Sequence, residues 1–113
     1  MNDHKLRIGN NLYSVEAMQK SHSDDSAMWG VTRPDSKEIG ILVDGAPLGI
    51  LLNTYIHEPL HAICAEHRID MPREQEERVV TSMADGIQQL IVDNPHYLDQ
   101  LVKLVKEARK QLQ

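Results

Sequence analysis

Hydrophobic positions in the first part of the chain follow the two-residue period of β-strands. Apolar and polar residues alternate over residues 5–15 on both sides of Gly9-Asn10-Asn11, which is typical of a turn. Two more short runs, Met28 to Thr32 and Glu38 to Val43, are separated by the turn-forming segment Arg33 to Lys37. The pattern predicts a small, mostly antiparallel sheet of about three strands. The polar stretch Ser21 to Ser26 predicts a loop.

After Asp44-Gly45-Ala46-Pro47 the spacing of apolar residues becomes helical. It predicts three helices, which run from Leu51 to about His67, from about Arg73 to Asp93, and from about Pro95 to Leu112. Asn94 is expected to be the N-cap of the third helix, with Pro95 at its first position. Strands followed by helices predict an α+β fold. The length of 113 residues predicts a single domain over residues 1–113.

The charge balance and the absence of long apolar runs exclude some function classes. A net charge of −5 argues against nucleic acid as the main partner, because phosphate binding needs a surplus of Lys and Arg. The nearly uncharged stretch from Ile39 to Ile56 is interrupted by Asp, Gly, Pro and Asn, so no membrane span is expected. Cys64 is the only cysteine, and the N-terminus lacks the apolar run of a signal peptide. We therefore expect a cytoplasmic protein.

The third predicted helix has one apolar face and one basic face. The apolar face holds Leu98, Leu101, Val105, Ala108 and Leu112. The basic residues are Lys103, Lys106, Arg109 and Lys110, which we interpret as a solvated face rather than a binding patch. The apolar face is a possible homodimer contact.

The first predicted helix carries His57-Glu58-Pro59-Leu60-His61, which matches the pattern H-E-x-x-H. Two histidines four residues apart lie on one helix face, so both imidazoles can reach one zinc ion. Glu58 points about 100° away around the helix, where it can act as a general base without being a ligand. The alternative is a helix with two surface histidines and an incidental glutamate. The apolar neighbours Ile56 and Leu60 disfavour it, because buried imidazoles need partners.

Pro59 lies inside this motif and conflicts with a regular helix. Proline in a helix interior removes one hydrogen bond and costs about 3 kcal/mol. Either the helix begins late, near Tyr55 or Ile56, or it kinks at Pro59.

A catalytic zinc site needs a third protein ligand. His67 would complete H-E-x-x-H-x-x-C-x-x-H, the metzincin spacing, but Cys64 stands where that pattern needs a helix-breaking Gly. Cys64 itself lies one turn after His61, and its thiolate would indicate a structural site. A lone helical cysteine is more often a small core residue.

The second predicted helix offers the stronger candidates. Glu76 falls near the centre of its apolar stripe, whereas Glu77 falls about 90° off it. A carboxylate on a buried stripe needs a charge partner, which a metal would supply. We therefore predict His57, His61 and Glu76 as the ligands of one Zn²⁺, with Glu77 and His67 as alternatives to Glu76.

The chain resembles the minimal zinc metallopeptidases often encoded in phages and prophages, related to the ImmA/IrrE and SprT-like groups. The resemblance covers about Trp29 to Leu98 and rests on the two strands, on Asn53 to Ala62 with its H-E-x-x-H, and on the Glu76-Glu77 helix opening. It implies a zincin-like core, with a small sheet on the motif helix and an acidic third ligand of the gluzincin kind from a downstream helix. It also implies His57 and His61 as ligands and Glu58 as catalytic base. Pro59 departs from the family, which more often has a helix former there.

The expected function is zinc-dependent hydrolysis of peptide bonds in a protein or peptide substrate. The substrate is expected to pair with the strand Glu38 to Val43 as an added strand. Tyr55 and Tyr97 are weak candidates for stabilising the oxyanion. The alternative is a binding or regulatory protein of the same fold, with a structural zinc or none.

Overall fold

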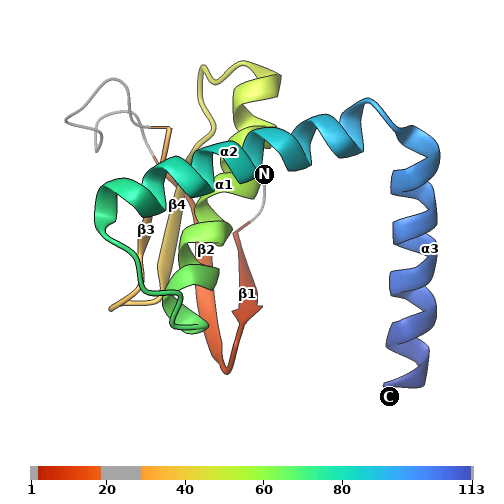
Figure 1. Cartoon of the computed structure of the whole chain (residues 1–113), viewed down its shortest axis with the longest axis horizontal. Coiled ribbons are helices and arrows are strands. Elements are labelled where there is room, and N and C mark those ends of the chain that lie inside the picture. The colour runs from red at the N-terminus through yellow and green to blue at the C-terminus, as the bar shows by residue number, and fades with distance from the viewer. Residues whose placement is uncertain (1–2, 19–28, 113) are drawn as a thin grey trace.

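The computed structural model describes residues 3–18 and 29–112 and has four strands followed by three helices (Figure 1). The elements are β1 (His4–Ile8), β2 (Asn11–Met18), β3 (Gly30–Arg33), β4 (Glu38–Leu42), α1 (Leu48–Glu66), α2 (Arg73–Val92) and α3 (Pro95–Gln111). The α+β prediction is confirmed, with four strands where about three were expected. The loop predicted at Ser21 to Ser26, and Met28 of the third predicted strand segment, lie outside the described residues.

The four strands form one mixed sheet in the order β1-β2-β4-β3. The neighbours β1 and β2 pair antiparallel, as do β3 and β4, whereas β2 and β4 pair parallel. Gly9 and Lys37 have positive φ angles at the two tight turns. The strand Glu38 to Val43 was expected to be the sheet edge that pairs with the substrate. This expectation is wrong, because β4 is hydrogen-bonded on both sides, and among the described strands β3 is the edge next to it.

The core lies between the sheet and α1. Tyr13 and Val15 on β2 and Ile39 and Ile41 on β4 are almost fully buried, and Val15 is the register partner of Ile39. Residues two apart on a strand share one face, so this alternation gives the sheet an apolar side. Ala62 of α1 is fully buried in the same cluster, and its small side chain allows close packing on the sheet.

Helix α1 lies between the sheet and α2, because it packs against β1, β3 and β4 and also against α2. It begins at Leu48, so the late start near Tyr55 or Ile56 is wrong. Pro59 lies well inside the helix, and α1 continues for almost two turns beyond it. The motif is therefore in the middle of a long helix, where packing on both sides outweighs the cost of the proline.

A tight reversal after α1 brings the start of α2 back toward the motif. The backbone N–H of His67 donates to Ile63 and that of Ile69 donates to Cys64, both at 2.9 Å. Arg68 between them has a φ of 55°, the left-handed conformation that commonly ends a helix. Pro72 then stands at the N-cap of α2, so the first turns of α2 run beside α1.

The last turn of α1 is tied to both β-turns through the carboxylate of Glu66. One oxygen accepts from Asn11, and the other accepts from the Tyr13 hydroxyl and the Lys37 ammonium group at 2.7 Å each. The hydrogen bonds from Lys37, Tyr13 and Asn11 lower the pKa of Glu66 to about 2. Burial and the nearby Glu66 carboxylate raise the pKa of Tyr13. This cluster fixes the sheet relative to the helix that carries the motif.

Helix α3 extends from the end of α2 and stands clear of the sheet in Figure 1. Pro95 is in its first turn, as predicted, and Asn94 is at the N-cap position. The Asn94 side chain, however, donates back to the Leu90 carbonyl at 2.9 Å instead of capping α3. Among the residues that the structure describes, no helix combines the length and apolar character that crossing a membrane requires.

Candidate metal centre

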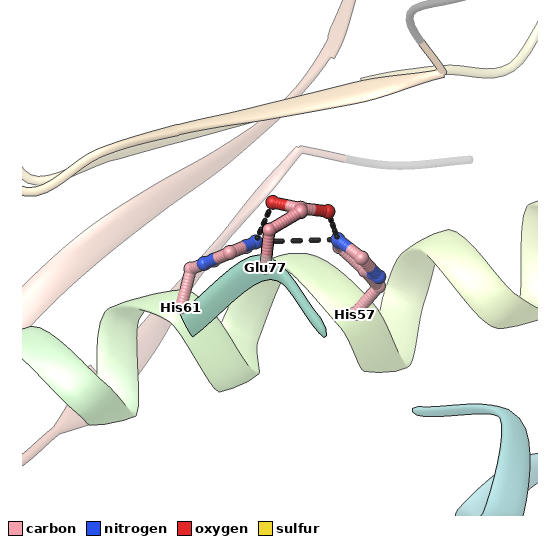
Figure 2. A group of neighbouring side chains, drawn as sticks. All are labelled: His57, His61 and Glu77. Atoms are coloured by element: carbon pink, nitrogen blue, oxygen red, sulfur yellow. Dashed lines mark hydrogen bonds and ion pairs between the residues drawn. The ribbon is translucent and has the colours of Figure 1, made fainter. Parts of the chain in front are cut away.

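His57 and His61 of α1 and Glu77 of α2 point their side chains at one another (Figure 2). The Nε2 atoms of the two histidines are 3.2 Å apart. Glu77 Oε1 lies 3.1 Å from His57 Nε2, and Glu77 Oε2 lies 3.0 Å from His61 Nε2. The i, i+4 spacing places both imidazoles on one helix face, and the α1–α2 reversal brings the carboxylate over them.

The spacing of these atoms fits a zinc ion. Zinc bonds of about 2.0–2.1 Å place the ligand atoms of a tetrahedral site about 3.3 Å apart. The two Nε2 atoms, 3.2 Å apart, are close to that value, while the 3.1 and 3.0 Å distances run to different oxygens of Glu77. With one ligand atom taken from each residue, the three atoms lie within 4.8 Å of one another. A hydrogen bond places one proton between one donor and one acceptor. A cation at the centre of the three groups would instead contact all of them at once. Both histidine side chains are only 16% exposed, so water satisfies them poorly.

Glu76 takes a different position from the one expected of a ligand. Its Oε2 lies 2.7 Å from Nδ1 of His61, on the opposite side of the ring from Nε2. A neutral imidazole that donates from Nδ1 to this carboxylate has its lone pair on Nε2, which faces the cluster. Carboxylates in this position orient metal-binding histidines and increase their basicity. The structure therefore brings Glu77, and not Glu76, to both Nε2 atoms.

Glu58 lies beside the cluster but outside it. Its Oε2 is 3.9 Å from His57 Nε2, and its side chain is 10% exposed. The hydroxyl of Thr32 on β3 lies 2.8 Å from Glu58 Oε1 and 2.9 Å from the Glu58 carbonyl oxygen. One carboxylate oxygen is thus held by β3 while the other faces the histidines. A carboxylate held in this way keeps one oxygen free to accept a proton on the side of the histidines.

Strand β3 approaches α1 closely at Gly30. A Cβ atom there would lie 2.7 Å from Thr54 Cγ2 and 2.8 Å from Glu58 Cγ, closer than non-bonded carbons approach. Thr54 is itself buried and donates to the Ile50 carbonyl. Glycine at position 30 therefore lets the edge strand lie against the Glu58 side chain.

The cluster opens into two cavities that share Gly30, His57 and Glu58. One, of about 450 Å³, contains the whole cluster and extends along β3. Its lining residues are Gly30, Val31, Thr32, Pro34, His57, Glu58, His61, Ala65, Arg73, Glu76 and Glu77. The other, of about 530 Å³, lies along the earlier part of α1, between Trp29 and the α2 residues Thr81, Asp85 and Gln88.

The two alternative ligands on α1 do not reach the cluster. His67 is the exposed C-cap residue of α1 and lines a separate cavity with the β-turn residues Gly9 and Asn10. Cys64 is buried and lines a fourth cavity with Ile69 and Met71. Burial and the charge of Glu76 raise the pKa of the Cys64 thiol, which disfavours the thiolate needed for zinc binding.

Neither tyrosine proposed for the oxyanion is among the residues that line the cluster's cavity. Tyr55 packs against the hydrophobic core, and burial, with a smaller effect of Asp3, raises its pKa. Tyr97 lies on α3, beyond the far end of a 20-residue helix that is about 30 Å long.

Sequence reasoning missed Thr32 and Gly30. Both lie in the predicted strand Met28 to Thr32, and their partners on α1 are distant in the sequence. The need of a buried Glu58 for a hydrogen-bond donor was a signal, but it did not identify which residue supplies the donor.

Comparison of the chain with protein-family models, with curated proteins and with solved structures gave no match. The assignment of a function to this cluster therefore depends on its geometry and chemistry.

Proposed function

We propose that this chain is a zinc-dependent metallopeptidase in which His57, His61 and Glu77 hold one Zn²⁺ and Glu58 is the general base. The observation that carries the proposal is the convergence of two Nε2 atoms, 3.2 Å apart, on one carboxylate, whose two oxygens lie 3.1 and 3.0 Å from them. A second carboxylate, that of Glu58, lies 3.9 Å from His57 Nε2. Glu77 replaces Glu76 as the proposed third ligand. Glu76 becomes the residue that orients His61.

The proposed roles follow from the positions of the side chains. Zinc, when bound, supplies a Lewis acid that lowers the pKa of water and polarises a carbonyl group. Glu58 Oε2 faces the cluster and accepts a proton from the attacking water, then delivers it to the leaving amine. Thr32 holds the other oxygen of Glu58, so the base keeps its orientation as its charge changes.

The proposed substrate is an extended peptide segment that pairs with β3. This strand is the edge of the sheet beside the cluster, and Gly30, Val31 and Thr32 line the cavity that contains it. An added strand on an exposed edge gains main-chain hydrogen bonds that do not depend on its side chains. The second cavity, which adjoins His57 and Glu58, has room for a substrate side chain.

The test is the metal content and the peptidase activity of the wild type and of Glu58→Gln. We expect about one zinc per chain in both proteins, measured by elemental analysis after purification without added metal. The wild type should cleave a mixture of unstructured proteins, detected by mass spectrometry of the fragments. Glu58→Gln should lower the cleavage rate by about 10²–10⁴-fold, because the amide accepts no proton.

The matched control is Glu74→Gln, the same change on an exposed residue in the first turn of α2. It should change neither the zinc content nor the cleavage rate. A wild type without metal, or a Glu58→Gln variant with full activity, would contradict the proposal. Zinc binding without cleavage would instead support a non-catalytic binding protein of the same fold.

A further inference from the structure

The cavity of about 530 Å³ beside the cluster has both apolar and polar lining. Trp29, just before β3, and Ile50 of α1 are its large apolar side chains. Its polar end lies between α1 and α2 and is formed by Asn53, Asp85 and Gln88. His57 and Glu58 line the same cavity. A peptide bound at the cluster can therefore extend a side chain toward this polar end.

The amide donors of the polar end are directed at acceptors of the protein itself. Asn53 Nδ2 donates to Asp85 Oδ1 at 3.0 Å and to Gln88 Oε1 at 2.8 Å, which uses both amide hydrogens of Asn53. Gln88 Nε2 donates to the Gly49 carbonyl at 3.0 Å. Asp85 Oδ2 accepts no hydrogen bond from a described residue. The polar end thus offers a ligand mainly hydrogen-bond acceptors.

The charge of this cavity also favours a cation. Glu58 and Asp85 are its acidic lining residues, and no Lys or Arg lines it within the described part of the chain. Asp85 is exposed and forms no ion pair with a described residue. The first turn of α1, which reaches the cavity at Gly49 and Ile50, contributes about half a positive elementary charge. This is less than the charge of one carboxylate.

The position of Asp85 requires a long side chain. Asp85 lies about two helix turns beyond Glu77 on α2, or about 12 Å along the axis. Lys and Arg carry their charge at the end of an apolar stem, which suits a path along Trp29 and Ile50. Their charged groups are rich in donors and have no acceptor, so they complement a polar end that offers acceptors. A short polar side chain would not reach it.

We propose that this cavity is a specificity subsite for a Lys or Arg side chain of the peptide substrate, and that Asp85 recognises its charge. The proposal rests on the proposed function, because the subsite adjoins the same cluster. The stem of the basic side chain packs against Trp29 and Ile50, and its charged end donates to Asp85 Oδ2. The substrate class is therefore an extended peptide with a basic residue beside the scissile bond.

The first test is peptide binding to the whole Glu58→Gln chain as purified, whose result does not depend on cleavage. The probes are the capped pentapeptide Gly-Gly-Arg-Gly-Gly and the same peptide with citrulline, an uncharged isostere, in place of arginine. NMR titration should show about two- to fivefold tighter binding of the arginine peptide, the gain expected of a solvent-accessible ion pair. Adding Asp85→Asn should remove this preference, because the amide has no charge but can still accept from Asn53.

The matched control is Asp99→Asn, the same change on an exposed residue of α3, which should keep the preference. Three results would overturn the proposal. They are equal affinities for the two peptides, no binding of either, and a preference that survives Asp85→Asn. A purely structural role of Asp85 would not distinguish arginine from citrulline.

The second test is the cleavage pattern of the wild type on unstructured proteins. Lys and Arg should be enriched at one fixed position beside the cut, and Asp85→Asn should lower this enrichment by about two- to fivefold. Cuts without such enrichment would overturn the proposal. A wild type that cleaves nothing would contradict the proposed function. The binding test would then decide by itself whether the cavity takes a basic side chain, so the two failures are distinguishable.

Discussion

At the scale of single residues, the neighbours Glu76 and Glu77 of α2 contact different nitrogen atoms of the motif histidines. The helical wheel correctly ordered their burial, because the Glu76 side chain is 28% exposed and that of Glu77 is 57% exposed. The wheel does not show where α2 crosses α1. At that crossing the less buried carboxylate faces both Nε2 atoms and the more buried one faces Nδ1.

This difference predicts unequal effects of removing each carboxylate. Glu77→Gln should weaken zinc binding by more than about 100-fold, because it removes the proposed third ligand. Glu76→Gln should weaken it by about 10–100-fold, because the amide still contacts His61 but no longer increases its basicity. Competition with a chromophoric chelator measures both affinities, with Glu74→Gln as the control. The reverse order of the two effects would make Glu76 the ligand.

At the scale of elements, the hydrophobic pattern predicted the three helices to within a few residues of their ends. Their long apolar stripes and the Pro72, Asn94 and Pro95 signals are local features, which sequence reasoning can use. The strand order β1-β2-β4-β3 could not be predicted, because the parallel pairing of β2 with β4 joins residues that are distant in the chain. That order decides which strand is the edge, and so the expectation that Glu38 to Val43 forms an edge was wrong.

The contact between β3 and α1 yields a prediction for Thr32. Thr32→Val removes the hydroxyl that donates to the buried Glu58 carboxylate, so it should destabilise the fold by about 1–3 kcal/mol. Thr32→Ser should restore most of the loss. The measurement is chemical denaturation of the metal-free protein, repeated in the Glu58→Gln background. The effect of Thr32→Val should be smaller there, because an uncharged amide needs the donor less. An equal loss in both backgrounds would assign the effect to packing alone.

At the scale of the whole molecule, the carboxylate of Glu66 links the end of α1 to both β-turns and makes the stability depend on pH. Its pKa is about 2 in the fold, against 4.5 for a glutamate without these contacts. A carboxyl whose pKa is lowered by folding stabilises the fold at pH values above its unfolded pKa. This contribution decreases as the pH falls below about 4.5 and is lost near pH 2.

We therefore expect the free energy of unfolding to fall more steeply with acid in the wild type than in Glu66→Gln. The two proteins should differ most near pH 7 and converge between about pH 5 and about pH 2. Urea denaturation at a series of pH values measures this difference. Glu107→Gln, which removes an exposed carboxylate 3.7 Å from Lys110, is the control and should follow the wild type. A constant difference between wild type and Glu66→Gln at all pH values would refute the role of its ionisation.

The tight reversal between α1 and α2 also has a consequence for the order of events during folding. The side chains of His57, His61 and Glu77 come from positions 57 to 77, within one helical hairpin of low contact order. The hairpin can form before the slower, non-local pairing of β2 with β4. Thr32 joins Glu58 only once the sheet has docked on α1. Under the proposed function, a nascent chain would bind its ion first and acquire an oriented base later, so that metal loading and catalytic competence would arise at separate steps.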